Sequence, residues 1–414
     1  MKEYSFRLTK AACYSSYFTM SSVFCVPPLL FVTFKETYDI SYTLLGTLVL
    51  VNFLTQLGID LIFTFFSKYF NPKLMIRTMP LLTSLGLAIY AIVPTVAPDL
   101  AYLGLLIGTV IFSVSAGLSE VLLSPTIAAI PSDDPKREMS LLHSLYAFGV
   151  LATVLFSTLF LKLFDVRNWS YLILVLAALP IISAVLFTIS PMPDISDKDS
   201  VEGAKMGGRR TLGLALCVGC IFFGSCAETV MSTWISGYVE GALGVDKLVG
   251  DVLGVCMFAV LLGLTRIWYA KYGKNIFKML LIGMIGCSVC YTLVGVVSNM
   301  IIAFIACILV GLFSAMLWPG TLIMMEENLP GVGVGAFALM ASGGDFGAAL
   351  APQLMGVVID EISATDIAAE IGTRLGLAPD QVGMKAGMLI TAIFPIIGTA
   401  LVIITMRYFK KAKA

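Results

Sequence analysis

Long apolar stretches separated by short polar segments follow one another along the entire 414-residue chain. Each stretch exceeds about 18 residues, which lets a helix cross ~30 Å of hydrocarbon. None shows the strict alternation of a membrane β-barrel. Breaks at Pro, Gly, Asn and charged residues predict twelve spans, at 10–34, 40–66, 74–96, 99–130, 139–163, 169–190, 210–239, 247–271, 275–297, 299–327, 333–360 and 384–407. The pattern predicts an all-α membrane protein with twelve transmembrane helices.

Composition agrees with this prediction. Charged residues make up 13% of the chain and hydrophobic residues 58%, whereas soluble domains carry about 25% charged residues. The net charge of zero gives no reason to expect nucleic acid as a partner. All nine cysteines lie in apolar segments, which argues against a disulfide framework, and the C-x-x-C at 217–220 lacks the second ligand pair that a metal site needs. The basic and then apolar N-terminus has no convincing cleavage site, so we expect an uncleaved first helix.

The distribution of Lys and Arg predicts the orientation. With a cytoplasmic N-terminus, 20 of the 26 basic residues fall in inner segments and six in outer ones. An even number of spans then puts the C-terminus in the cytoplasm as well. We therefore expect a multi-pass protein of the plasma (inner) membrane with both termini cytoplasmic.

A polar segment in the middle of the chain predicts two domains. Residues 191–209 have the composition of a flexible cytoplasmic linker and separate a six-helix bundle at 1–190 from another at 210–414. Three features recur in both halves: Gly-Leu eight residues before Pro (GLSEVLLSP from Gly117 and GLFSAMLWP from Gly311), a Phe-Gly in the next span (148–149 and 346–347), and a basic inner loop (67–73 and 270–278). Together they predict a duplicated six-helix unit.

Acidic residues inside the spans are candidate functional groups, because charges at membrane depth are costly and usually face a cavity. Glu120 lies in the fourth span on one stripe with Ser113, Gly117 and Ser124. Glu228 lies in the seventh span between Ser225 and Ser232, with Trp234 nearby. We interpret both acids as lining a wet cavity. The alternative for Glu120 is a neutral acid bonded to a neighbouring helix.

Three further polar sets are candidates. Asp345 lies in GGDFG, where Gly343 and Gly347 allow close helix approach, so a packing role is as good an interpretation as a functional one. Asn52, Gln56 and Asp60 form one line along the second helix, and for Asp60 a gate or interhelical contact is favoured over substrate contact. His143, with Tyr146 on the same face, is a candidate proton relay or a satisfied hydrogen-bonding residue. Trp318 could stack on a ligand ring or pack ordinarily.

The whole chain resembles the major facilitator superfamily of secondary transporters. Its basic loops, SKYFNPK and AKYGKNIFK, resemble the G-x-x-x-D-R-x-G-R-R loop motif of that superfamily. Lys68 and Lys271 stand at the position of its Arg, and Ser67 and Ala270 replace its Asp. The resemblance implies two bundles related by a pseudo-twofold axis, alternating access, and a gate or loop-motif role for Asp60, Lys68, Lys73, Arg266 and Lys271.

Within that superfamily, the fourth and fifth spans resemble the fucose permease group of sugar/proton symporters. Glu120 precedes Pro125 as in L-E-T-A-A-N-P, with Ser124 in place of the Asn. In LHSLYAFG, His143 stands at the Gln and Tyr146 at the Asn of A-Q-T-F-N-S-F-G. The first helix of the group carries an aspartate, whereas residues 10–34 contain no acid. The resemblance implies a proton-linked glutamate and sugar contact in these two helices.

These observations predict a secondary active transporter that carries a small polar solute, such as a sugar, by proton symport. Glu120 is the main protonation site, with Glu228 and Asp345 as further proton-coupling candidates. We expect a monomer in the lipid bilayer, a small-molecule substrate with H⁺, and no cofactor, since no G-x-x-x-x-G-K-[ST] nucleotide loop is present. The substrate-contact candidates are Asn52, Gln56, Ser124, His143, Tyr146, Ser232 and Trp318.

Two other classes of protein share some of these features. A proton-driven exporter of drugs or amphipathic molecules could share the fold, and 26 Phe and 20 Met fit it, although lipid-facing helices need bulky apolar residues in any case. A polytopic membrane enzyme is the other class. The sequence has no H-E-x-x-H and only one His, so metal chemistry is not expected. A sensor or scaffold without transport is a further alternative.

Overall fold

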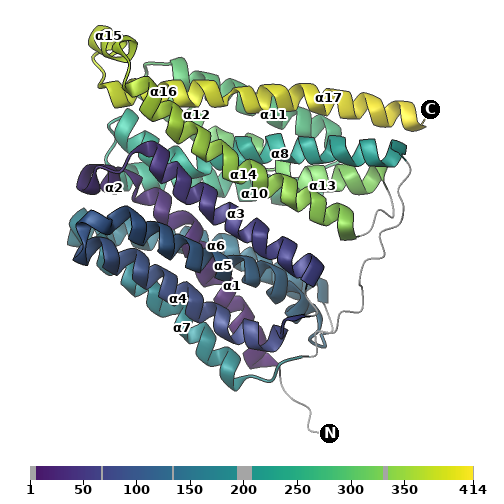
Figure 1. Ribbon diagram of the computed structural model, residues 1–414. Coiled ribbons are helices and arrows are strands. Elements are labelled where there is room, and N and C mark those ends of the chain that lie inside the picture. Colours follow the sequence, from purple (N-terminus) through teal and green to yellow (C-terminus); the bar gives the residue numbers. More distant parts are fainter. Residues whose placement is uncertain (1–5, 67–68, 133–134, 194–207, 330–333, 414) are drawn as a thin grey trace. The chain divides into compact units, whose positions relative to one another are not determined.

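The computed structural model describes residues 6–66, 69–132, 135–193, 208–329 and 334–413 (Figure 1). Within the helices it leaves out the side chains at 64, 65, 128, 135–137, 139, 140, 143, 144, 146, 147, 270, 334, 335, 337, 338, 412 and 413. The described part is helical and contains no strand, so the prediction of an all-α protein is confirmed.

The described part of the N-terminal half contains seven α-helices, some of which share a span. They are α1 (Arg7–Leu29), α2 (Phe31–Tyr38), α3 (Tyr42–Phe66), α4 (Pro72–Val96), α5 (Ala101–Ala128), α6 (Pro135–Phe164) and α7 (Trp169–Ile189). Single 3₁₀ turns precede α5 (Pro98–Leu100) and α7 (Val166–Asn168). The helices begin and end close to the predicted boundaries, except that the first span extends to Tyr38 through a 50° bend between α1 and α2.

The C-terminal half has more interrupted helices. They are α8 (Gly208–Gly237), α9 (Lys247–Val249), α10 (Met257–Tyr272), α11 (Ile276–Val296), α12 (Met300–Ser314), α13 (Leu317–Asn328), α14 (Val334–Ser363), α15 (Asp366–Leu375), α16 (Pro379–Thr391) and α17 (Ile393–Lys413). Two π-helical segments, Tyr238–Ala242 and Gly250–Cys256, extend α8 and connect α9 to α10.

Membrane-spanning potential is distributed as the sequence pattern predicts. In the described part of the chain, nine helices are long and apolar enough to cross a bilayer, or ten if the bent α1–α2 pair is one span. Residues Phe148–Phe164 of α6 form a further, shorter apolar helix. The predicted eleventh span coincides with α14.

The predicted tenth span, 299–327, is not one continuous helix. It breaks between α12 and α13 at Ala315–Met316. The physical reason is Pro319, which has no N–H to donate to the carbonyl four residues earlier, that of Ala315. The predicted twelfth span likewise begins earlier than expected, at Pro379, and is interrupted at Ala392.

A helix that the hydrophobic pattern did not predict, α15, lies between the last two spans. Its ends carry ordinary helix signals: the Thr365 hydroxyl accepts a hydrogen bond from the Ala368 N–H at 3.1 Å, and Gly376 ends the helix with a left-handed φ of 69°. An exposed ion pair between Arg374 and Glu370, at 2.6 Å, lies along it. Hydropathy alone misses such a helix because it is too short and too polar to span a membrane.

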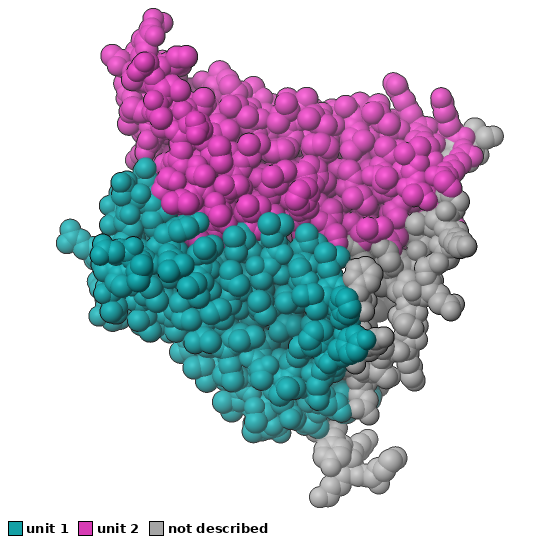
Figure 2. Space-filling view, in the orientation of Figure 1, with its two compact units in different colours: residues 1–40, 51–199 teal, residues 41–50, 200–414 magenta. Residues whose placement is uncertain are grey.

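The chain divides into two compact units (Figure 2). Unit 1 contains residues 1–40 and 51–199, and unit 2 contains residues 41–50 and 200–414. The predicted halves, 1–190 and 210–414, differ from this division mainly in the first turns of α3, which group with unit 2. Residues 194–207 of the predicted linker lie outside the described residues.

The repeated sequence features occupy equivalent places in the two units. In unit 1, a Cβ at Gly117 of α5 would lie 3.0 Å from the Ile59 Cβ of α3. In unit 2, a Cβ at Gly311 of α12 would overlap the carbonyl of Phe258 in α10. In each unit, the glycine of the fourth span therefore lets it approach the second span closely.

The Phe-Gly pairs show the same correspondence. A Cβ at Gly149 of α6 would overlap the carbonyl oxygen of Phe18 in α1, and a Cβ at Gly347 of α14 would overlap that of Phe222 in α8. Each glycine thus permits backbone contact between the fifth and the first span of its own unit. These matched contacts support the predicted duplication of a six-helix unit.

The start of α3 is fixed by an acidic residue of unit 2. Asp360 of α14 accepts hydrogen bonds from the backbone N–H groups of Tyr42 at 3.1 Å and Thr43 at 2.6 Å. A carboxylate at a helix N-terminus satisfies unpaired N–H groups and interacts favourably with the helix dipole. A Cβ at Gly356, one turn before Asp360, would overlap the Tyr42 carbonyl, so the two helices touch through their backbones.

The contact at Gly347 generates a prediction of stability. Gly347→Ala should lower the free energy of unfolding by about 1–3 kcal/mol, because its Cβ overlaps the Phe222 carbonyl. Gly263→Ala, in α10, is the matched control, since no atom lies within 4 Å of its added Cβ. It should leave stability unchanged or raise it by up to about 1 kcal/mol. Thermal unfolding of the purified protein measures both, and equal effects of the two substitutions would contradict the packing described.

Candidate functional site

Glu120 of α5 is the acidic group of unit 1 that lies deepest in a span. Its side chain is exposed although the residues around it, from Ser115 to Ser119, are buried. It interacts electrostatically with Tyr17 of α1 and Asp60 of α3. It forms no hydrogen bond or ion pair with any side chain that the structure describes. The carboxyl group therefore opens to an accessible space on the side of α5 that α1 and α3 approach.

Asn52 and Gln56 do not share that space. Both side chains are buried, and the Asn52 Oδ1 accepts hydrogen bonds from the Ser113 hydroxyl at 2.7 Å and from the Gln56 Nε2 at 2.9 Å. This network joins α3 to α5 two turns before Glu120. Of the predicted line along α3, only Asp60, which is half-buried, lies near Glu120.

The remaining candidates of unit 1 are described unevenly. Ser124 is half-buried, one turn after Glu120. His143 and Tyr146 lie in α6, but their side chains are outside the described part of the chain. Of the loop-motif residues, Lys68 also lies outside the described residues, and Lys73 is exposed in the first turn of α4.

A charged cluster between α1 and α6 was not predicted. Lys10 forms an ion pair with Glu138 at 2.7 Å, and the Tyr14 hydroxyl donates to the other carboxylate oxygen of Glu138. All three residues lie near the ends of their helices that are predicted to be cytoplasmic. The sequence does show opposite charges near the cytoplasmic ends of the first and fifth spans. It does not show that these two spans lie side by side, because that is a tertiary contact.

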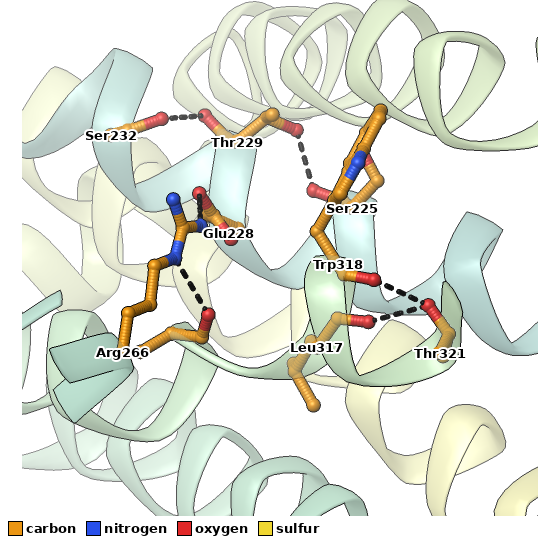
Figure 3. Close-up of polar contacts among 9 residues, drawn as sticks. Ser225, Glu228, Thr229, Ser232, Arg266, Leu317, Trp318 and Thr321 are labelled. Atoms are coloured by element: carbon orange, nitrogen blue, oxygen red, sulfur yellow. Dashed lines mark hydrogen bonds and ion pairs between the residues drawn. The ribbon is translucent and has the colours of Figure 1, made fainter. Parts of the chain in front are cut away.

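In unit 2, Glu228 forms an ion pair with Arg266, a residue that the sequence pattern assigned to a cytoplasmic loop (Figure 3). The Arg266 Nη2 lies 3.3 and 3.5 Å from the two carboxylate oxygens of Glu228, and its Nε donates to the Ala315 carbonyl at 2.9 Å. The side chains of Arg266 and Glu228 are 40% and 20% exposed. Arg266 was predicted with the cytoplasmic loop, yet it lies six residues inside α10 and points at α8.

The helix break explains why Arg266 lies there. Pro319 leaves the Ala315 carbonyl without its helical donor, and Arg266 supplies the missing hydrogen bond. The duplication relates Gly117 to Gly311, and the same offset relates Glu120 to Ser314, the residue before Ala315. In each unit, therefore, the polar chemistry lies at the same point of the fourth span.

The other unit 2 candidates lie on four different helices. Ser232 is exposed one turn after Glu228, and its hydroxyl donates to the Thr229 carbonyl at 3.2 Å. Trp318 is the second residue of α13, and a Cβ at Gly344 of α14 would overlap its indole ring, so the ring packs against that helix. Asp345, the next residue, is half-buried and interacts with a neighbouring group. Lys271 is exposed near the end of α10, with its Nζ 5.3 Å from the centre of the Tyr272 ring.

A second unpredicted cluster lies beside the two π-helical segments. Asp251, 1% exposed, accepts a hydrogen bond from the Ser236 hydroxyl and lies 3.5 Å from the Lys247 Nζ, which is also 3.2 Å from Glu240. Lys247 was predicted as an outer-loop residue. Its ammonium group compensates the charge of Asp251, which would otherwise be costly to bury.

Comparisons with known proteins agree on the fold. Three transporter structures each align with 94% or more of this chain. A bacterial homolog of the human lysosomal transporter Spinster, in an inward-facing and occupied conformation, is 15% identical, with a TM-score of 0.74 and coverage of 99% of this chain and 98% of that one. The nucleoside transporter NupG is 12% identical, with a TM-score of 0.68 and coverage of 97% and 98%. A D-xylose–proton symporter is 15% identical, with a TM-score of 0.70 and coverage of 94% and 96%.

Sequence comparison identifies the family. No curated protein sequence matches the chain. The family model of the Major Facilitator Superfamily matches residues 12–352, which is most of the chain. The fold of twelve transmembrane helices in two six-helix bundles, which the sequence pattern predicts, is the fold of that family. The chain therefore belongs to the Major Facilitator Superfamily, and it is a multi-pass membrane transporter and not an enzyme.

Proposed function

We propose that this transporter couples the movement of a small polar solute, of the sugar class, to the movement of protons in the same direction. The observation that carries the proposal is the state of Glu120. Its carboxyl group lies within a membrane span and is exposed, and none of the described side chains pairs with it. A carboxyl group in that situation can exchange a proton with water on either side of the membrane as access alternates.

The negative charge of Asp60 makes the protonated form of Glu120 more favourable. The two acids interact electrostatically, and two negative charges in a poorly solvated place repel each other. Proton binding to Glu120 removes that repulsion and the cost of a charge at membrane depth. The protonated form would then allow loading and reorientation, and release of the proton to the cytoplasm would complete the cycle.

The sugar class rests on the resemblance of the fourth and fifth spans to fucose permeases and on the D-xylose–proton symporter among similar structures. It is also supported by the hydroxyl groups near the two acids, at Ser124 in unit 1 and at Thr229 and Ser232 in unit 2. A hydroxyl group can both donate and accept a hydrogen bond, so these side chains are suited to a solute that carries many hydroxyl groups.

An exporter of amphipathic molecules is the second candidate, and one observation favours it. Unit 2 contains a cavity of about 430 Å³ with an apolar lining between α10, α11 and α12, where Trp268 and Phe313 contribute aromatic rings. Extrusion of several unrelated dyes by cells that express the protein would decide for the exporter.

The coupling role of Glu120 predicts a separation of two activities. Glu120→Gln should reduce the accumulation of solute against its gradient at least about tenfold, because the amide cannot bind and release a proton. Exchange of labelled for unlabelled solute across the same vesicles should persist. Glu361→Gln is the control. It replaces an exposed acid near the end of α14 and should accumulate solute normally. Undiminished accumulation by Glu120→Gln would show that protons are not coupled through this residue.

The buried network at Asn52 predicts a structural rather than a substrate-binding role. Asn52→Ala should lower the free energy of unfolding by about 1–3 kcal/mol, because the Ser113 hydroxyl and the Gln56 amide lose a buried partner. The KM of exchange should change less than about twofold. Thermal unfolding and exchange kinetics on the same preparation test this. A large rise in KM without loss of stability would instead place Asn52 in contact with the solute.

A further inference from the structure

The guanidinium of Arg266 is only partly used by the protein. Nε donates to the Ala315 carbonyl at 2.9 Å, and Nη2 lies 3.3 and 3.5 Å from the Glu228 oxygens. A close charge-assisted pair has distances of about 2.7–2.9 Å, so the contact with Glu228 is loose. Nη1 donates to none of the residues that the structure describes. Figure 3 draws no contact to this second terminal nitrogen, and 40% of the side chain is exposed.

The adjoining helix break adds a second feature that favours an anion. Helix α13 begins at Leu317, and the side chain of its N-cap residue, Met316, makes no capping hydrogen bond. A helix N-terminus carries a partial positive charge, and the half-helices of broken membrane spans place that charge beside anionic substrate groups. The negative end of α12, at the Ala315 carbonyl, is already compensated by Arg266.

Two buried hydroxyl groups beside the pair have no partner. The Ser225 hydroxyl, one turn before Glu228 on α8, and the Ser314 hydroxyl, next to Ala315, are both fully buried and form no hydrogen bond among the described residues. Buried hydroxyls are normally paired. One unpaired hydroxyl therefore lies one turn before Glu228, and the other lies next to the residue whose carbonyl Arg266 contacts.

We propose that Arg266 binds the carboxylate of an acidic solute, and that Glu228 occupies the guanidinium when the solute is absent. The inference rests on the proposed function and narrows the solute class from sugars to sugar acids or similar hydroxylated monocarboxylates. A carboxylate fits the planar fork of Arg. A phosphate ester carries almost two negative charges, whereas Arg266 is the one cation that the described residues bring to Glu228. A single guanidinium therefore matches the single charge of a carboxylate better than the charge of a phosphate ester.

A purely structural pair would look different. If Arg266 served only to satisfy the Ala315 carbonyl and to neutralise Glu228, short distances to both and an acceptor for every guanidinium nitrogen would be expected. Instead the guanidinium is the more exposed member of the pair, and one of its terminal nitrogens has no acceptor in the described part of the chain. This geometry leaves room for a second carboxylate to compete with Glu228 for Arg266.

Equilibrium binding to the purified full-length protein tests the proposal. The probes are matched neutral and acidic sugars, D-glucose with D-glucuronate and D-gluconate, and D-galactose with D-galacturonate, scored by the shift in melting temperature over a concentration series. We expect at least one acid to bind at least about tenfold more tightly than its neutral partner. Binding of the neutral sugars alone, or of no acid, overturns the proposal.

Substitutions then test the residues. Arg266→Gln should weaken binding of the acid at least about tenfold, and Arg266→Lys should weaken it less, because it keeps the charge but not the fork. Glu228→Gln should strengthen binding about threefold or more, since it removes the competing carboxylate. A merely structural pair would not give opposite effects from its two members. Unchanged acid binding in Arg266→Gln overturns the assignment.

Two control variants distinguish a specific loss of acid binding from misfolding of the variant. The double variant Arg266→Gln/Glu228→Gln leaves no unpaired charge in the span, and it should fold while still failing to bind the acid. Arg374→Gln breaks an exposed Arg–Glu pair of α15 and should bind the acid as the unaltered protein does. The measurement uses no gradient, so it is independent of the Glu120→Gln experiment. Undiminished accumulation by Glu120→Gln would contradict the coupling role and leave the binding result standing. Failure of the acids to bind would contradict the role of Arg266 and leave the coupling result standing.

Discussion

A backbone carbonyl at membrane depth must find a donor, since hydrocarbon offers none. This constraint acts most visibly at Ala315. Pro319 removes the helical donor of that carbonyl, and the Nε of Arg266 replaces it. The replacement brings a guanidinium into the interior of unit 2, which in turn requires an anion, and Glu228 provides it. One proline in the tenth span thus accounts for a helix break, a half-buried cation and the position of its counter-ion.

The two units meet the same constraint in different ways. Unit 1 keeps its fourth span as one helix, α5, and carries Glu120 at the position where unit 2 has Ser314. Unit 2 breaks its fourth span and places a paired Glu and Arg beside the break. The matched glycines at 117 and 311, and at 149 and 347, keep the helix contacts alike. Duplication has therefore conserved the backbone approach within each unit while the polar side chains have diverged.

The fold could be predicted from the sequence because hydrophobic length and the repeated Gly-Leu and Phe-Gly pairs are local signals. Glu120 and Glu228 could be picked out as well, since a lone acid in an apolar span is conspicuous. Their partners could not. Arg266 lies near basic residues in the sequence and was assigned with them, whereas the contact that defines it joins α10 to α8 and to the break in the tenth span. Asn52 and Gln56 look suited to a ligand by residue type, but their hydrogen bonds are directed at Ser113. A helical line shows which residues share a face, not what that face meets.

Helix α3 is unusual in that its first turns group with unit 2 and the remainder with unit 1. Its leading peptide groups are held by Asp360, while its later turns bond to Ser113 through Asn52. The Asp360 cap and the Asn52 network therefore belong to different units but act on one continuous helix, α3. The covalent backbone of that helix carries the unit boundary at Val51 without a loop or a chain break.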